Sequence, residues 1–516
     1  MAAVTVALLV GLAVCIVGLL MRAVKNKQTS SIPGPPGLPF VGHVLQFMTV
    51  DQELLFSRLL EIVDGRRLTQ LYIMNYPVVI TSDPACIGEV VRRKDLLDKS
   101  YFPYCFFRAA FKDGIFVLKG AEWKQRRTWL SPGFRKSVLD SFIGDFSAVA
   151  KAFLKTVPTG EDVEVRELLA DPITRAFMLT SLGDGSEKGE EALAAVDFIE
   201  EFFAAIIKRA VNPMLWPHWL FMLTADGRKL DKAKRTFDEF TRRFITRKRE
   251  ALRNRRASDA HLKRRTLLDF MMDTPQHQES MSEEAIQDEV KNFFIAAADT
   301  SATVLGWAFK ILSLLPEVQE RLHAEICDVF GDSERDVSIE DIPKLKYMER
   351  FLKEVMRMFP PGAVIGRQCY GQTTLWGHEI PANTTIAINI FSAHRDPRHW
   401  SEPGRFDPDR FLPDAARNRH PYAYMPFSAG SRNCIGGTYA MYLMTTLLCS
   451  MIRDFSVLPV DDGHVDLQSL SDHLSINVTL RLRGGFRVKF RSRGAGLGPH
   501  AQPTASRRHA AWNASS

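Results

Sequence analysis

The ten residues 427–436, FSAGSRNCIG, constrain this chain more than any other segment. Glycines around Cys434 let backbone approach its sulfur closely, and backbone N–H groups aimed at a thiolate stabilise its charge. Arg432 supplies a guanidinium suited to a carboxylate, and Phe427 would shield the sulfur on one side. A thiolate held in this way is a good axial ligand for haem iron. The alternative is a buried cysteine in a glycine-rich turn, but the spacing FxxGxRxCxG is too long and particular to favour it.

The composition is that of a large packed protein. Hydrophobic residues make up 46% and charged residues 25% of the 516 residues, too apolar for a disordered chain and too mixed for many membrane spans. The cysteines number seven and include no CxxC pair, so neither a disulfide framework nor a structural zinc site is indicated. A reducing compartment is the simpler interpretation.

The N-terminus predicts a membrane anchor. Residues 1–21 contain no charge and no proline, and at about 1.5 Å per residue such a helix just spans a hydrocarbon core of roughly 30 Å. Positive charges follow at Arg22, Lys25 and Lys27, which places the rest of the chain in the cytosol. We therefore expect a single-pass anchor at 1–21 and a basic, proline-rich linker at 22–45; a cleaved secretory signal is the alternative.

The body of the chain predicts mainly α-helix with small β-sheets. A β-hairpin is expected over 71–80, with its turn at 75–77. Asp83 before Pro84 predicts the start of a helix, with the aspartate as its N-cap. A second β-rich piece is expected over 384–390.

The longest predicted helix starts near Ser280 and Glu283, which have capping-box spacing, and runs to Leu315 before a proline. At about 1.5 Å per residue it is about 50 Å long, enough to cross a whole domain. Its second half is apolar and must be buried, yet the segment 296–301 reads AAADTS. An acid and two hydroxyls are costly there unless they are hydrogen-bonded or wet.

Three further motifs make the chain resemble the cytochrome P-450 family of haem-thiolate monooxygenases over nearly its whole length. The ExxR motif of the family is Glu354–Arg357 here, and its WxxxR helix is matched by Trp123–Arg127. Its Pro-Glu-Arg-Phe element appears as Pro403–Phe406, with Gly404 in place of the glutamate. The resemblance implies a P-450 fold over 46–490, in which the long central helix lies over haem b.

The resemblance also assigns site residues. Cys434 is implied to be the axial ligand of the haem iron. Other positions implied to contact the haem or its propionates are Trp123, Arg127, Ala296, Thr300, Arg367, Phe427, Arg432 and Gly436. Glu354, Arg357 and Arg405 are implied to form a buried structural network, although a Glu–Arg pair at this spacing more often lies on a solvated helix face.

The segment 296–301 matches the family pattern [AG]Gx[DE]T[TS], except that Ala297 stands where glycine is usual. By resemblance, Thr300 orients a hydrogen bond and Asp299 relays protons from solvent, because splitting dioxygen consumes protons. Hydrogen bonding of both side chains to the helix backbone is a compatible alternative. We expect the extra methyl of Ala297 to affect the efficiency of oxygen activation more than its occurrence.

Aromatic residues fall where the family lines its substrate pocket. The segments and residues are 101–107 (YFPYCFF), Phe202, Phe203, Trp216, Trp219 and Phe221, with Val364 and Ile365 as a third lining position. Each could equally be plain core, since aromatic stripes usually are. Together they indicate a lipid-like substrate drawn from the bilayer.

Basic charge is concentrated in 242–265, where eleven Lys or Arg stand against two acidic residues. A solvated helix and loop is the favoured interpretation, and attraction to an anionic bilayer or an acidic electron donor is the second. Nucleic-acid binding is not expected, because no aromatics interleave these charges. Residues 491–516 predict a disordered tail.

The resemblance implies a monooxygenase of the endoplasmic reticulum membrane that takes electrons from NADPH through a separate reductase. The donor must be another protein, because no flavin or nicotinamide domain fits in the remaining length; cytochrome b5 is a further candidate partner. The alternatives are a haem-thiolate isomerase or dehydratase that needs no external electrons, and a non-enzymatic haem sensor or lipid carrier. The Asp299–Thr300 pair argues against the isomerase, which has no need to protonate dioxygen.

Within the family, the Pro-rich stretch 32–39 and segments 291–301, 345–347 and 423–427 resemble the branch of microsomal fatty-acid ω-hydroxylases and sterol side-chain hydroxylases. Many ω-hydroxylases carry a glutamate at the position of Ala296 that bonds covalently to haem. Its absence here shifts the expectation away from a strict ω-hydroxylase and leaves fatty acids, sterols and xenobiotics as candidate substrates.

Overall fold

A computed structural model of the protein describes residues 31–63, 65–183, 189–253, 265–272, 281–461, 463 and 466–494. The predicted anchor at 1–21 lies outside the described residues, as do residues 22–30 of the linker, 254–264 of the basic segment and 495–516 of the tail.

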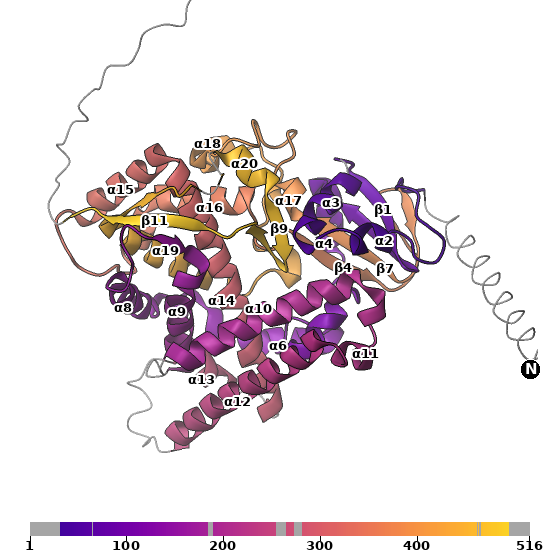
Figure 1. Ribbon diagram of the computed structural model, residues 1–516, viewed down its shortest axis with the longest axis horizontal. Helices are drawn as coiled ribbons and strands as arrows, with labels where there is room; N and C mark the ends of the chain where they lie inside the picture. Colours follow the sequence, from indigo (N-terminus) through magenta and orange to yellow (C-terminus); the bar gives the residue numbers. More distant parts are fainter. Residues whose placement is uncertain are drawn as a thin grey trace, which may run out of the picture.

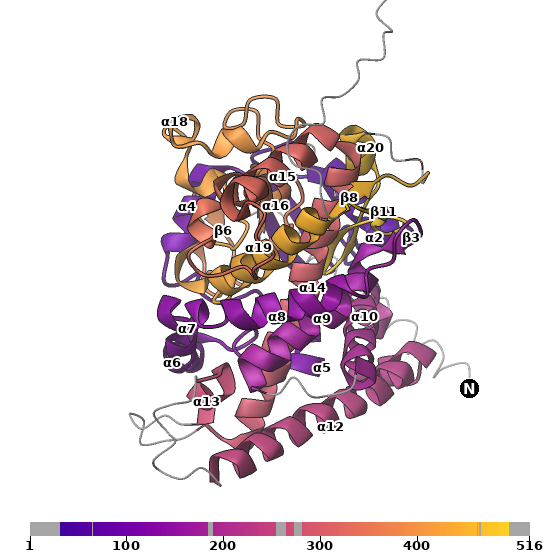
Figure 2. The ribbon, with the colours of Figure 1, turned by 90° about the vertical axis from the view of Figure 1, so that its left-hand side faces the viewer.

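Helices make up most of the molecule (Figures 1 and 2). They are α2 (Val44–Met48), α3 (Leu55–Val63), α4 (Pro84–Arg92), α5 (Arg108–Phe111), α6 (Gly120–Leu130), α7 (Lys136–Asp140), α8 (Ile143–Leu154), α9 (Val165–Phe177), α10 (Gly189–Val211), α11 (His218–Met222), α12 (Ala225–Arg253), α13 (Leu267–Met272), α14 (Glu283–Leu314), α15 (Pro316–Phe330), α16 (Lys346–Met358), α17 (Ile390–Ala393), α18 (Pro413–Ala416), α19 (Gly437–Asp454) and α20 (Leu467–Asp472).

The strands form small sheets. They are β1 (Leu68–Ile73), β2 (Tyr76–Thr81), β3 (Asp162–Glu164), β4 (Val364–Cys369), β5 (Thr373–Leu375), β6 (His378–Ile380), β7 (Thr384–Asn389), β8 (Phe455–Leu458), β9 (Leu474–Asn477), β10 (Thr479–Leu482) and β11 (Arg487–Ser492). The largest sheet has the order β1-β2-β7-β4, in which only the β2–β7 pair is parallel. The expectation of a mainly helical protein with small sheets is confirmed.

Local sequence signals explain several of these elements. The hairpin forms as β1 and β2, but its turn lies at Met74 and Asn75, one residue earlier than predicted, because Pro77 pairs with Tyr72 inside the ladder. Met74 takes the left-handed φ of 54° that this tight turn requires. Asp83 caps α4 as predicted, its carboxylate accepting two backbone N–H groups of the first turn.

Helix α14 crosses the centre of the molecule, between α19 on one side and α10 and α12 on the other (Figure 2). Its N-cap is Ser282, whose hydroxyl accepts the N–H of Ala285; the predicted cap, Ser280, lies outside the described residues. Among the described residues it is the one helix long and apolar enough to cross a membrane, and 83% of its most apolar window is buried in protein. It is therefore the core helix of the fold.

Two large apolar clusters flank α14. One packs its second half against α8, α9, α16 and α19. The other packs its first half against α10, α12 and the short helix η2 (Tyr104–Phe107). The second cluster reaches Ile435, the neighbour of Cys434 in the chain. The loop that carries the cysteine thus lies where the aromatic-rich half of the core ends.

Candidate haem-binding site

The Cys434 loop is shaped by its backbone. The Cys434 N–H donates to the Phe427 carbonyl at 2.9 Å, which closes the loop just before α19. Gly430 is required, because its φ is 71° and a Cβ there would lie 2.5 Å from the Val91 carbonyl oxygen. A Cβ on Gly436 would lie 4.0 Å from the Cys434 sulfur, an ordinary contact. Gly436 therefore matters for its N–H, which acts on the thiol, more than for its missing side chain.

The Cys434 sulfur is surrounded by protein, yet its side chain is exposed. These two facts agree if the sulfur faces an internal hollow. Burial raises the pKa of the Cys434 thiol, while the Gly436 N–H, Arg127 and Lys99 each lower it. A metal cation bound at the sulfur would, like the Gly436 N–H, Arg127 and Lys99, lower the pKa of the thiol and favour the thiolate.

Arg432 lies beneath the indole of Trp123, its guanidinium carbon 4.0 Å from the ring centroid. It donates to the Leu97 and Leu118 carbonyls and to Asp98 at 3.1 Å. Burial lowers the pKa of Arg432 to about 10, so it stays charged at neutral pH. Its Nη1 is buried and has no acceptor among the described residues, which leaves donors for a further anion.

Three more cations surround the same loop. Arg127 donates to the backbone and side-chain oxygens of Asn433, both at 3.0 Å. Arg367 is 3% exposed and donates to its neighbour's carbonyl and weakly to Ser428, with no carboxylate partner among the described residues. Lys99 lies 3.1 Å from the Phe116 ring centroid, and burial followed by repulsion from Arg367 and Arg432 lowers its pKa well below the usual value.

These residues fit haem. The cofactor brings two carboxylates and an iron ion, and the loop offers a thiol together with cations that have unused donors or no acidic partner. Of the predicted contacts, Trp123, Arg127, Arg367 and Arg432 all lie around this loop. Lys99 was missed by sequence reasoning, because a single lysine outside any motif carries no spacing signal.

The predicted oxygen-activation segment lies on α14, which runs through it without interruption. Ala296 is exposed in the middle of this otherwise buried helix, so it too faces an internal space. Thr300 is half-buried and its hydroxyl donates to the Ala296 carbonyl at 2.7 Å. This hydrogen bond to the helix backbone is one of the two roles that the sequence indicated for Thr300.

Asp299 points away from Thr300 into a buried ionic network. Its Oδ1 accepts from Arg166 at 2.8 Å and from Arg481 at 2.7 Å, and its Oδ2 accepts from Thr479 at 2.8 Å. Both arginines also pair with Glu200 of α10, whose side chain is 38% exposed. The network therefore connects a buried acid beside Thr300 with the protein surface. The sequence did not reveal these arginines, which come from α9 and β10.

The ExxR pair is completely buried. Arg357 forms a two-point ion pair with Glu354, at 2.7 and 2.8 Å, and donates to the carbonyls of His394, Pro403 and Arg405. Contrary to the prediction, the side chain of Arg405 lies outside this buried network. It is 66% exposed and pairs with Glu402. Arg410 donates to Glu354 at 3.1 Å in its place. The chain turns between 405 and 410 so that the backbone of Arg405 and the guanidinium of Arg410 face the pair.

The predicted substrate-lining aromatics come together. Phe106 and Phe107 of η2 contact Trp216 and Phe202, with ring centroids 6.3 and 6.1 Å apart. They belong to the apolar cluster that reaches Ile435, whereas Trp219 is 66% exposed and Val364 packs against the other half of the core.

Comparison with known proteins agrees with this geometry. The family model described as cytochrome P450 matches residues 32–480. A probable cytochrome P450 4ac1 from Drosophila melanogaster is 34% identical over 430 residues, which cover 82% of each chain. Cytochrome P450 4V2 from Rattus norvegicus is 28% identical over 495 residues, or 92% of each chain, and the Homo sapiens protein of the same name is 29% identical over 476 residues, or 89% of each.

Proposed function

The chain belongs to the cytochrome P450 family of haem-dependent monooxygenases, and we propose that it oxidises a hydrophobic, lipid-like substrate with electrons from NADPH. The observation that carries this proposal is the Cys434 loop, with its accessible thiol and its excess of cations, at the end of an aromatic-rich apolar cluster. A separate flavoprotein reductase supplies the electrons, with cytochrome b5 as a second candidate donor. Fatty acids, sterols and xenobiotics are the candidate substrates.

Haem would be held by the residues around this loop. Cys434 binds the iron, while Arg127, Arg367 and Arg432 pair with the propionates, and Trp123 packs against Arg432. Phe427 accepts the Cys434 N–H on its carbonyl, Gly436 lies close to the sulfur, and Ala296 faces the space from α14. When bound, the haem supplies the reduction of dioxygen and the transfer of one oxygen atom to the substrate.

We assign proton delivery to Thr300 and Asp299. The Thr300 hydroxyl donates its proton to the Ala296 carbonyl. Rotation of the side chain can redirect this proton toward the space that Ala296 faces. Asp299 is the candidate proton carrier beside Thr300, and its ionic network with Arg166 and Arg481, whose outer member Glu200 contacts solvent, holds this carboxylate in place. Burial raises the pKa of Glu200, but the nearby Arg166 and Arg481 outweigh it and hold the pKa below its usual value. Glu200 is therefore ionised at neutral pH and pairs with both arginines at the outer end of the network.

The alternatives are weaker on the same observations. An isomerase or dehydratase would need no proton supply, yet the chain places an acid and a hydroxyl at consecutive positions of α14, with the acid in a buried ionic network that reaches the surface. A haem sensor or lipid carrier would need no such acid–hydroxyl pair either. Dependence of product formation on NADPH separates the proposed function from both.

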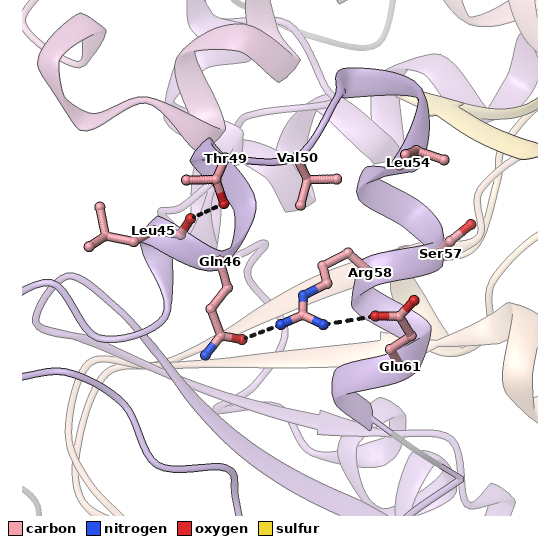
Figure 3. Close-up of a pocket in the computed structure, with 8 residues that line it drawn as sticks. All are labelled: Leu45, Gln46, Thr49, Val50, Leu54, Ser57, Arg58 and Glu61. Atoms are coloured by element: carbon pink, nitrogen blue, oxygen red, sulfur yellow. Dashed lines mark hydrogen bonds and ion pairs between the residues drawn. The ribbon is translucent and has the colours of Figure 1, made fainter.

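The N-terminal anchor would place one face of the protein at the endoplasmic reticulum membrane, with the catalytic domain in the cytosol. Apolar side chains on that face are exposed around α2 and α3: Leu38, Leu45, Met48 and Leu54. Leu45 and Leu54 also line a groove of about 560 Å³ between the two helices (Figure 3). The charged residues that line this groove, Arg58 and Glu61, form an ion pair with each other.

The test is reconstitution of the purified protein with a reductase. The reduced protein with carbon monoxide is expected to give the Soret band of a thiolate-ligated haem, and Cys434→Ser to abolish it while the neighbouring Asn433→Ser keeps it. Oxidised product from a lipid substrate is expected only when NADPH and reductase are both present. Product formed without NADPH would contradict the monooxygenase and favour the isomerase.

A further inference from the structure

The guanidinium of Arg395, two residues after α17, points into the protein. Arginines near a surface usually bury their aliphatic stem and keep the charged head in water. Arg395 is half-buried as a whole, yet its terminal nitrogens Nη1 and Nη2 are both buried and have no acceptor among the described residues. The guanidinium carbon lies 3.7 Å from the ring centroid of Phe391 and 5.3 Å from that of Phe359. The charged end of the side chain is therefore enclosed by aromatic rings.

The acid whose charge acts on Arg395, Glu354, is already occupied by other donors. Its Oε1 accepts from Arg357, from Arg410 and from the Asp407 N–H, and its Oε2 accepts from Arg357. Burial, followed by repulsion from Arg357, holds the pKa of Arg395 well below its usual range, and attraction to Glu354 opposes them only in part. Three arginines thus share the charge of one carboxylate. A buried cation without its own counter-charge is costly.

A further buried donor lies at the other end of the same short helix. The Oδ1 of Asn389 accepts the Ser392 N–H at 3.0 Å as the N-cap of α17, which fixes the orientation of the amide. The Nδ2 of Asn389 is buried and has no acceptor among the described residues. Helix α17 has four residues and is about 6 Å long. The unpaired atoms of Asn389 and Arg395 are all N–H donors, so what they need is an acceptor.

An anion meets this need better than a water molecule. Water would leave the buried charge of Arg395 unbalanced, whereas an anion balances it and accepts from both Nη groups. A monatomic anion also has no further oxygen atoms that require donors between the rings of Phe391 and Phe359. Chloride is the commonest monatomic anion in cells. The chemistry around Arg395 is therefore that of a chloride site.

We propose that Arg395 binds one chloride ion through its Nη1 and Nη2 groups, beside the buried ExxR pair. The ion supplies the counter-charge and fixes the segment that follows α17. That segment supports the cysteine loop, because the ring of His394 accepts the Met425 N–H at 2.8 Å, just before the loop begins. Chloride binding therefore stabilises the fold next to the haem-binding loop, whatever substrate the enzyme oxidises.

Bromide replaces chloride in the first experiment, because its anomalous X-ray scattering identifies it. Crystals of the full-length holoprotein are grown without chloride, in an isethionate buffer, and are then soaked in bromide. An anomalous peak is expected at hydrogen-bonding distance from both Nη atoms of Arg395. A water molecule or no density at that place, with bromide only at exposed arginines, would overturn the proposal. This experiment uses the wild-type chain and does not depend on the folding of a variant.

In solution, chloride is expected to raise the thermal unfolding midpoint of the wild-type holoprotein. The ionic strength is kept constant with isethionate, a larger organic anion, and circular dichroism follows unfolding. Saturating chloride is expected to raise Tm by about 1–2 °C relative to isethionate, because the ion binds the folded state alone. Equal midpoints in the two salts would contradict the proposal.

Arg395→Gln is expected to have the same midpoint in chloride and in isethionate, because it lacks the charge and the paired Nη groups. The matched control is Arg398→Gln, since Arg398 is exposed and pairs with Asp396 and Asp83. This control is expected to respond to chloride as wild type does. A chloride response that persists in Arg395→Gln would come from other sites and would overturn the proposal.

Discussion

Glu289 of α14 offers a sharp test of how the core is held together. It is completely buried, and its Oε1 accepts from the Ile115 N–H at 2.8 Å and from Arg126 of α6 at 2.7 Å. Its Oε2 is buried without a partner among the described residues. Burial raises the pKa of Glu289 to about 7, against the opposing effect of Arg126.

The sign of the pH effect follows from this shift. In the unfolded chain the carboxyl loses its proton near the ordinary glutamate pKa of 4.5, whereas in the folded protein it keeps it up to about pH 7. The folded state therefore binds more protons between these values, and the free energy of unfolding falls as pH rises. At 1.36 kcal/mol per pKa unit the total loss from Glu289 is about 3 kcal/mol, complete above pH 7.

Glu289→Gln keeps the shape and the acceptor oxygen but does not titrate. Relative to wild type, the variant is expected to gain about 3 kcal/mol in free energy of unfolding between pH 5 and pH 8. Urea unfolding of the holoprotein at both pH values, followed by tryptophan fluorescence, measures this difference. The raised pKa of the neighbouring Asp288 affects both proteins and cancels.

The matched control is Asp269→Asn, at a buried carboxylate paired with Lys248 at 3.0 Å. Burial opposes ionisation there, but the Thr266 N–H and Lys248 outweigh it and lower the pKa of Asp269. Because that group is ionised at pH 5 and pH 8, the control is expected to be destabilised equally at both. A wild-type-like pH slope in Glu289→Gln would refute the reasoning.

Three further outcomes are expected. Glu354→Gln should lower the free energy of unfolding by about 3–5 kcal/mol, because it leaves the buried cation of Arg357 unpaired. Arg405→Ala, at an exposed side chain, should change the free energy of unfolding by less than about 0.5 kcal/mol. Urea unfolding of both variants measures the two changes. Arg432→Gln should speed haem transfer to an acceptor apoprotein by about tenfold, while Arg417→Gln, exposed on the surface, leaves the rate unchanged. Thr300→Ala should keep the substrate-induced spin shift but oxidise more NADPH per product; unchanged coupling would count against its proton role.

Local sequence patterns predicted those elements whose formation depends on interactions between residues close together in the chain. The Asp83 cap, the hairpin and the long central helix follow from spacing and from residue type. The family motifs likewise predicted the buried pair of Glu354 and Arg357.

Longer-range contacts could not be read from the sequence. Arg405 and Arg410 are both followed by Phe and stand near the same turn, and only the path of the chain decides that Arg410 faces Glu354. Asp299 finds its partners Arg166 and Arg481 across more than a hundred residues in each direction. Such pairings depend on how α9 and β10 pack against α14, which no local pattern encodes.

The central claim is that this chain transfers one atom of dioxygen to a lipid with the other atom leaving as water. The most direct test is turnover of the reconstituted enzyme under isotopically labelled dioxygen, followed by mass spectrometry of the product. One labelled oxygen atom per oxidised product is expected, and none in the Cys434→Ser variant. Product whose new oxygen comes from water, or that carries no new oxygen, would contradict the account.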